Sequence, residues 1–257
     1  MAHPFETDNK IVVDAPPAAV WEAVTTGPGM DAWFMGWNEV EPREGGAVRT
    51  VTPAVSMEST VTVWEPPRRF AHEGPEAEDG SVHAFEWRIE ERGEGSSAVR
   101  WIHSGLLGGD WEADYEVLKE GDPAMLLKLG QYLTFFRGRR ATPITAWGQA
   151  AGGADGWRIF EQPLGLGTAV ALGERVRLTP SGLDPIDGVV DQLSRTLLGV
   201  RTDDALFRFA HGFGGDAVFV GHHLYADAGA DAQRAWERWL DRTFGEDATA
   251  AELHGRG

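Results

Sequence analysis

The chain has 257 residues and a net charge of −17, made of 24 acidic against 13 basic residues through Arg140 and 16 against 10 beyond it. Because both halves are acidic, the surface should repel phosphate backbones and anionic headgroups, and we expect no binding to nucleic acid or to a membrane. Cysteine is absent, which excludes disulfides, thiolate nucleophiles and thiolate metal sites.

The length predicts a protein of about two domains. An apolar content of 42% is enough for a sizeable core. The start, MAHPFETDNK, has no apolar segment of the signal-peptide type, and no later run approaches the roughly 20 apolar residues of a membrane span. We therefore expect a cytoplasmic location.

The first predicted elements are a strand and a helix. Ile11 and Val13 alternate as residues of a half-buried strand do, and Pro16 and Pro17 suit the first turn of a helix. This helix should bury one face, formed by Val20, Ala23 and Val24.

Strand-like runs and turns fill the next stretch of the chain. The predicted strands are residues 39–40, 47–51, 58–64, a strand beginning at Phe70, 82–90 and 98–104. Alternation places His83, Phe85, Trp87 and Ile89 on one face of their strand. Likewise, Val99, Trp101 and His103 share a face of the next strand. With no helix between them, these strands should form an antiparallel sheet.

A long amphipathic helix is predicted after the sheet. Its first part ends at Gly121-Asp122-Pro123, where a break, an N-cap and an N1 proline predict a kink or two separate helices. Beyond the proline, one apolar stripe is formed by Met125, Leu126, Leu129, Tyr132, Leu133 and Phe136. The sheet should bury its apolar face against this stripe.

Several short segments resemble a known family. They are APPAAVWEAVT at 15–25, AWF at 32–34, EPREGG at 41–46, WEPPRRF at 64–70 and WIHSG at 101–105. They are similar to the SRPBCC or START-like helix-grip superfamily, in the branch of the C-terminal domain of the heat shock protein 90 ATPase activator homologues. The resemblance covers about residues 5–138 and implies an α+β fold in which an antiparallel sheet wraps around a long C-terminal helix. It also implies a cavity between sheet and helix, in a superfamily that mostly binds apolar small molecules or protein partners and includes some cyclases.

The second half can be aligned with the first as a shortened repeat. Residues 143–147 take the place of the first strand, 156–159 that of the first helix, and 173–177 resemble 45–49. Further strands are predicted at 188–193, 197–201, 205–209 and 217–225, and Asp231 should cap a helix that buries Ala235, Trp236, Trp239, Leu240 and Phe244. We therefore predict a helix-grip domain over residues 1–140 and a smaller, degenerate helix-grip-like α+β domain with a C-terminal tail over 141–257. The alternative is an extension packed on the first domain.

Motifs of known chemistry are scarce. The sequence has no GxSxG, Walker, HExxH or EF-hand pattern, and Gly165-Leu166-Gly167 does not open a helix as a dinucleotide loop does. His222 and His223 are adjacent, so in a strand they point to opposite faces and do not chelate one metal ion. We predict no metal and no cofactor.

His103 is the most informative candidate for a site, because it is in phase with Trp101 near the expected cavity. A hydrogen-bonded core histidine is the simpler interpretation, and ligand contact or acid/base work is the other. Tyr115 and Tyr132 offer hydroxyls but also suit plain packing. From the family resemblance, Trp33 and Phe34 lie at the cavity entrance, as a gate or as packing. The predicted ligand-binding residues are Trp33, Phe34, Trp87, Trp101, His103, Tyr115, Leu129 and Tyr132.

Three functions are compatible with this sequence. The first is non-enzymatic binding of an apolar or aromatic small molecule. The second is a module that binds a protein partner, as the heat shock protein 90 ATPase activators do, which an exposed apolar patch would favour. The third is a cyclase or dehydratase in which His103 and a tyrosine transfer protons, although the sequence identifies no catalytic residue.

Overall fold

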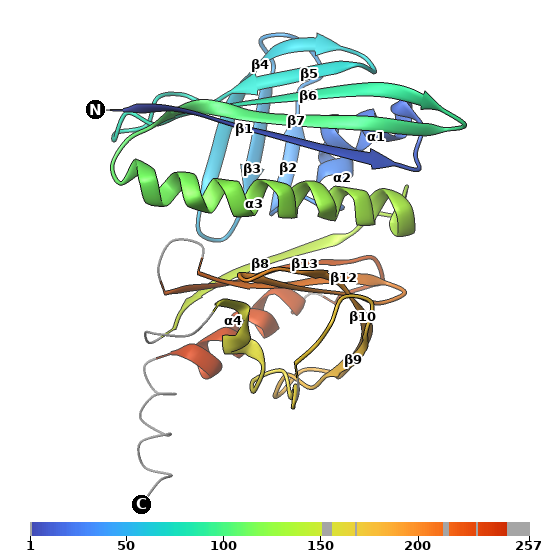
Figure 1. Ribbon diagram of the computed structural model, residues 1–257, viewed down its shortest axis with the longest axis vertical. Helices are drawn as coiled ribbons and strands as arrows, with labels where there is room; N and C mark the ends of the chain where they lie inside the picture. Colours follow the sequence, from blue (N-terminus) through green and yellow to red (C-terminus); the bar gives the residue numbers. More distant parts are fainter. Residues whose placement is uncertain (1, 151–155, 168, 213–215, 230, 246–257) are drawn as a thin grey trace, which may run out of the picture. The chain divides into compact units, whose positions relative to one another are not determined.

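The computed structural model describes residues 2–150, 156–167, 169–212, 216–229 and 231–245. The chain forms two compact units, Met1–Ala141 and Thr142–Gly257 (Figure 1).

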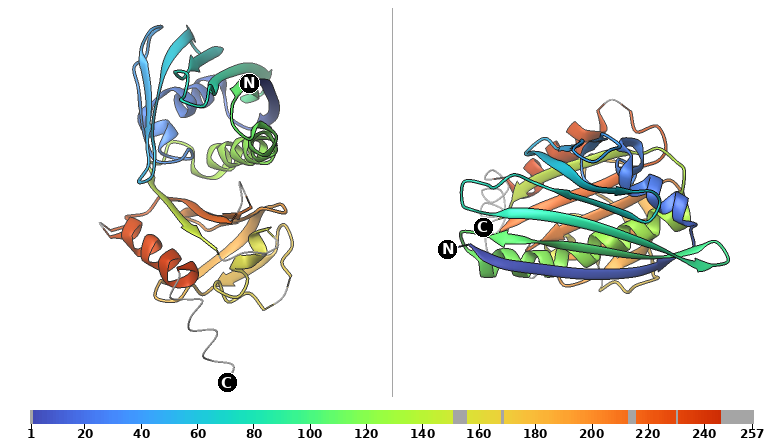
Figure 2. Two further views of the ribbon diagram at one scale, coloured as in Figure 1. Left: turned by 90° about the vertical axis from the view of Figure 1, so that its left-hand side faces the viewer. Right: turned by 90° about the horizontal axis from the view of Figure 1, so that it is seen from above.

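The N-terminal unit is one antiparallel sheet of seven strands with a long helix after the last strand (Figure 1). The strands are β1 His3–Val13, β2 Trp37–Val40, β3 Ala47–Val51, β4 Ser56–Glu65, β5 Arg69–Glu73, β6 Val82–Gly93 and β7 Ser96–Leu107. The helices are α1 Pro17–Thr25, α2 Gly27–Met30, α3 Trp111–Gln131 and a π-helical turn, η1 Tyr132–Phe136. The strand order β1-β7-β6-β5-β4-β3-β2 brings the first strand beside the last, and the sheet curls over α3 (Figure 2, left view).

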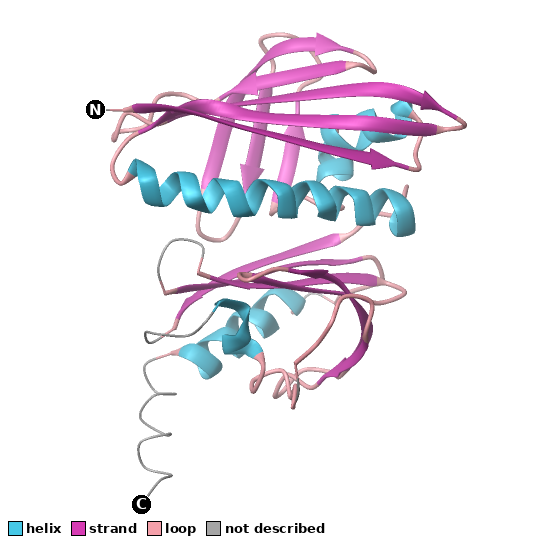
Figure 3. Cartoon of the chain, in the orientation of Figure 1, coloured by secondary structure: helices cyan, strands magenta, loops and turns pink. Residues whose placement is uncertain are grey.

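The helix α3 differs from the prediction at Pro123. It is a single helix from Trp111 to Gln131, so the predicted division into two helices is wrong (Figure 3). A proline inside a helix costs about 3 kcal/mol because it removes one hydrogen bond and crowds the preceding turn. Here contacts with the sheet hold α3 on both sides of the proline. Asp122, before it, forms hydrogen bonds with Thr7 and His103, and Leu126, after it, is buried. Tertiary contacts therefore override the local signal.

The predicted apolar stripe is largely the one that the sheet covers. Leu126, Leu129, Tyr132, Leu133 and Phe136 are buried, whereas Met125 is half-buried. Gly130 permits a close approach to β1, since a Cβ atom there would lie 2.7 Å from Cδ1 of Ile11. A larger residue would require the end of the Ile11 side chain to shift.

The C-terminal unit repeats this plan on a smaller scale. Its elements are β8 Thr142–Gln149, a 3₁₀-helix η2 Gly156–Phe160, β9 Arg175–Leu178, β10 Ile186–Leu193, β11 Leu197–Arg201, β12 Ala205–His211, β13 Ala217–Leu224 and α4 Ala232–Phe244. The order β8-β13-β12-β11-β10-β9 again places the first strand beside the last, and α4 follows the last strand and packs on β8. The predicted fold class, two antiparallel sheets each packed against a helix, is confirmed.

The interior of the C-terminal unit is a packed aromatic and aliphatic core. Phe160, Phe209 and Trp239 are at most 1% exposed and their rings lie 5.6 to 6.2 Å from one another. Trp236 joins them, as the predicted stripe of α4 requires. Asp231 stands at the N-cap position, but its side chain makes no capping hydrogen bond.

Candidate functional site

A chain of four polar side chains crosses the interior of the N-terminal unit. The Thr7 hydroxyl lies 2.5 Å from Oδ2 of Asp122, and the same oxygen lies 3.0 Å from Nδ1 of His103. The other ring nitrogen of His103, Nε2, lies 2.9 Å from Nδ1 of His83. These contacts join β1, α3, β7 and β6 in one hydrogen-bonded network.

Strand register explains why these residues meet. Thr7 is paired with His103 across β1 and β7, and His83 lies one strand further, opposite Gly105. Paired residues of an antiparallel sheet project from the same face, here the face toward α3. Asp122 completes the network from the middle of α3, and Thr7, His103 and Asp122 are all buried.

The network defines where protons can lie. An ionised Asp122 accepts from the Thr7 hydroxyl and from Nδ1–H of His103. Nε2 of a neutral His103 then accepts from Nδ1–H of His83, whereas a protonated His103 donates to it. Burial and the nearby His103 charge lower the pKa of His83, which favours its neutral form. The geometry thus allows a proton to move between His83 and His103.

Aromatic rings line the same face of the sheet. Trp87 and Trp101 stack with centroids 4.9 Å apart and an angle of 5° between the planes, and Phe85 stacks on His103 at 4.3 Å. His72 of β5 extends the row, 5.0 Å from Phe85. Burial, followed by the charge of His103, lowers the pKa of His72 to about 3, so this imidazole is neutral at physiological pH.

Part of this inward face is not covered by other side chains. Asn9, His72 and Phe85 all project toward α3, yet each is only half-buried. By contrast, the central aromatic residues of the C-terminal unit are fully buried. Phe85 and His72 therefore keep some accessible surface, whereas the C-terminal unit has a filled core.

Among the predicted residues, Trp87, Trp101 and His103 are buried together on this face. Trp33 is also buried and packs edge-on against Trp87 at 5.8 Å, and its Nε1–H donates to the carbonyl of Ala23. It is thus fixed in the packing.

Phe34 is half-buried and packs edge-on against Trp33 at 5.4 Å. Leu129 is fully buried in the stripe of α3 that the sheet covers.

The hydroxyl groups of the two tyrosines form hydrogen bonds with backbone groups. The Tyr132 hydroxyl accepts from the backbone N–H of Gly138, and burial raises its pKa. Tyr132 lies ten residues beyond Asp122, about 15 Å along the helix axis. Tyr115 is half-buried, with its hydroxyl 3.4 Å from the carbonyl of Glu6 at the edge of β1. That Tyr132 faces the same internal space as His103 stays a prediction.

Three residues of the network were not predicted as site residues. The sequence pattern indicates Asp122 as a helix N-cap and places His83 with Phe85 on one face without a role, and no pattern singles out Thr7. Spacing relates residues within one strand, whereas the contact of His83 with His103 depends on the register between β6 and β7.

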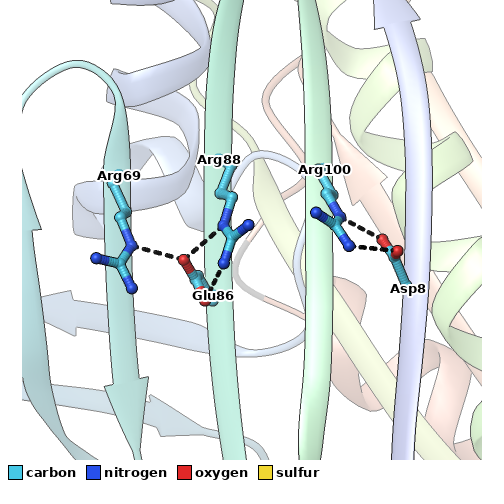
Figure 4. A network of polar contacts seen from close by, with 5 residues as sticks. All are labelled: Asp8, Arg69, Glu86, Arg88 and Arg100. Atoms are coloured by element: carbon cyan, nitrogen blue, oxygen red, sulfur yellow. Dashed lines mark hydrogen bonds and ion pairs between the residues drawn. The ribbon is translucent and has the colours of Figure 1, made fainter.

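The opposite face of the sheet carries an exposed charged network. Glu86 bonds to Arg69 and Arg88, and Arg100 makes two bonds of 2.6 Å to Asp8 (Figure 4). These side chains lie across neighbouring strands, facing away from the aromatic rings.

Two further surface features lie near β2 to β5. Trp37 and Val51 are register partners, 54% and 48% exposed, and form a small exposed apolar pair. A pocket of about 410 Å³ lies against β4 and β5 and is lined by Glu58, Ser59, Thr60, Thr62, Glu73, Gly74 and Pro75. Its polar, acidic lining does not suit an apolar ligand.

The described residues contain no cluster of three or more histidine or acidic side chains placed to hold a metal ion. His222 and His223 are both buried. His222 packs edge-on against Trp236 at 4.2 Å, and its Nδ1 accepts from the backbone N–H of Arg208. Within the described part of the chain, no helix is long and apolar enough to cross a membrane.

Comparison with solved structures finds proteins of similar chain arrangement. The di-domain ARO/CYC protein BexL of the BE-7585A biosynthetic pathway is 14% identical with a TM-score of 0.47, over 96% of this chain and 95% of BexL. DynU16, from the dynemicin biosynthetic locus, is 18% identical with a TM-score of 0.46, over 98% and 99%. The Aha1 dimer protein of Colwellia psychrerythraea is 22% identical with a TM-score of 0.43, over 52% of this chain and 99% of its own. At such low identities, these likenesses do not bear on what the chain binds.

Sequence comparison identifies the family of the N-terminal unit. Among curated proteins, no sequence matches the chain. The family of polyketide cyclases, dehydrases and lipid transport proteins matches residues 4–121, which extend from β1 into α3. The N-terminal unit is thus similar to this family over residues 4–121, and it belongs to the SRPBCC/polyketide cyclase helix-grip superfamily.

Proposed function

We propose that the N-terminal unit binds an apolar aromatic small molecule between the inward face of its sheet and α3. The observation that carries this proposal is the row of stacked rings on that face, of which Phe85 and His72 remain partly accessible. Flat aromatic side chains provide a large apolar contact area for an aromatic ligand. The proposed contacts are Trp87, Trp101 and His103 on the sheet and Leu129 on α3, with Trp33, Phe34, Tyr115 and Tyr132 around them.

The C-terminal unit is proposed to have a structural role. Its equivalent space is filled by Phe160, Phe209, Trp236 and Trp239. A ligand would have to displace these buried rings, whose truncation typically costs 3–5 kcal/mol each.

Native mass spectrometry of freshly purified full-length protein tests the binding proposal. We expect a retained small molecule that is released on denaturation. Phe85→Ala should reduce its occupancy, whereas Arg88→Ala, on the same strand but facing outward, should not. Equal occupancy in both variants would contradict the proposed location.

Proton transfer on the bound molecule is the second candidate function. The Asp122–His103–His83 network favours it, because a carboxylate that orients a histidine is a common arrangement in general acid–base catalysis. If the protein has such an activity, His103→Gln should preserve binding of its substrate and lower turnover by about 10²-fold or more. Unchanged turnover would leave binding as the function.

A further inference from the structure

Two buried hydrogen-bond donors on the inward face have no acceptor. Nε1 of Trp101 and Nδ2 of Asn9 are both inaccessible to solvent, and neither has a hydrogen-bond partner among the described residues. The Trp101 side chain is nearly fully buried, with 3% of the residue exposed. An unmet buried donor is unfavourable, so two at one position require an explanation.

Register places both donors at one position in the sheet. Asn9 and Trp101 are direct partners across β1 and β7. Asn9 lies between Thr7, which bonds to Asp122 of α3, and Ile11, which lies beneath Gly130 of α3. Side chains two residues apart on a strand share a face, so Asn9 projects toward α3. Trp101 also projects toward α3, because it is two residues from His103 on β7.

Resting on the proposed function, we infer that Asn9 and Trp101 form a two-donor site for a carbonyl oxygen of the bound aromatic molecule. Both groups offer N–H donors, so the complementary ligand atom is an acceptor with two lone pairs. The stacked Trp87 and Trp101 rings next to this position favour a carbonyl conjugated to a flat ring system. His103 lies two residues along β7 from Trp101, about 7 Å away. The ligand is thus predicted to be an aromatic ketone or a related conjugated carbonyl compound.

A matched pair of probes isolates the donor site. Equilibrium dialysis of the full-length protein gives the dissociation constants of two ligands, 2-acetylnaphthalene and 2-isopropenylnaphthalene. The second differs from the first in that a CH₂ group replaces the carbonyl oxygen. Wild-type protein should bind the ketone about tenfold more tightly than the alkene, the effect of two hydrogen bonds of ordinary strength.

Variants assign that preference to the two residues. Asn9→Leu and Trp101→Phe should each reduce the ketone preference several-fold, and the double variant should abolish it. Trp87→Phe is the control, because it reduces the same stacked surface without removing either donor and should weaken both probes equally. Both single variants should still unfold cooperatively on heating, because each substitution removes a buried donor that has no hydrogen-bond partner and so breaks no hydrogen bond of that donor.

The outcomes separate this inference from the proposed function. Equal binding of both probes by wild-type protein, or a preference unchanged in the double variant, would overturn the donor site and leave aromatic binding intact. Failure of both probes to bind up to their solubility limits would overturn both proposals.

Discussion

Oδ2 of Asp122 lies 3.0 Å from Nδ1 of His103, and this contact ties the middle of the long helix to the centre of the sheet. Thr7 donates to the same oxygen from the neighbouring strand. A buried carboxylate is tolerated only when such partners replace its lost hydration. The contact between Asp122 and His103 should therefore contribute to the stability of the N-terminal unit whatever the function of the site.

Replacing this carboxylate should destabilise the N-terminal unit. Asp122→Asn leaves His103 without its charged acceptor in a buried environment, and we expect a loss of about 2–4 kcal/mol in the free energy of unfolding. Glu116→Gln, at an exposed position of the same helix, should change it by less than about 0.5 kcal/mol. Urea denaturation followed by circular dichroism measures both, and similar losses in the two variants would contradict the structural role of Asp122.

The stripe of α3 makes a second stability prediction. Leu129 is fully buried, so Leu129→Ala should lower the free energy of unfolding by about 2–5 kcal/mol. Leu127, two residues earlier, is 49% exposed, and Leu127→Ala should have an effect of less than about 0.5 kcal/mol. A loss below about 0.5 kcal/mol for Leu129→Ala would show that the stripe does not stabilise the fold as inferred.

The core of the C-terminal unit is tested by its tryptophans. Trp236 is 5% exposed among aromatic neighbours, and Trp236→Ala should destabilise that unit by about 3–5 kcal/mol. Trp147, 46% exposed on β8, contacts mainly Phe219, and Trp147→Ala should cost about 1 kcal/mol or less. Thermal unfolding of the two variants gives the comparison, and an equal shift would argue against a buried Trp236.

Acidification should destabilise the protein through its neutral imidazoles. The pKa of His72 is lowered to about 3 by burial, and that of His83 is also lowered, whereas an unfolded histidine titrates near 6.5. Between these values the unfolded chain binds more protons than the folded one. Stability should therefore fall as the pH is lowered from about 6.5 to 5, by at most about 1.4 kcal/mol per pH unit for each group.

Variants identify the groups responsible for that slope. His72→Gln keeps a polar partner for Ser59 but cannot titrate, so its stability should fall less steeply between pH 6.5 and 5. The carboxylates with lowered pKa values, Asp8, Asp79 and Glu86, act only at lower pH. Denaturation at several pH values gives the slopes, and an unchanged slope in His72→Gln would refute the assignment.

Ligand binding should depend on His103 if the site is used as proposed. His103→Ala should weaken a bound aromatic ligand by about 1–3 kcal/mol, the scale of an unmet buried hydrogen bond. His103→Gln keeps a donor toward Asp122, so it should fold more stably than His103→Ala. Isothermal titration with the molecule recovered from the native protein gives the affinities, and unchanged affinity in His103→Ala would place the ligand elsewhere.

The order of the strands and helices, and the faces of β6 and β7, could be predicted from the sequence. Strand alternation has a period of two, so the spacing of Trp101 and His103 predicts that they share a face of β7. Trp87 projects from the same side because the register pairs it with Trp101 across β6 and β7. The repeat of the plan in the second half was also readable, because Trp236 and Trp239 recur at helical spacing after a run of strands.

Only the tertiary structure decided which side chains meet in the interior. Thr7 and Asp122 are 115 residues apart, and no local pattern signals a contact over that separation. The same contacts keep α3 continuous across Pro123, where propensity predicts a kink or a break. The unmet donors of Asn9 and Trp101 were likewise invisible, because a missing hydrogen bond is a property of the packed interior and not of a sequence pattern.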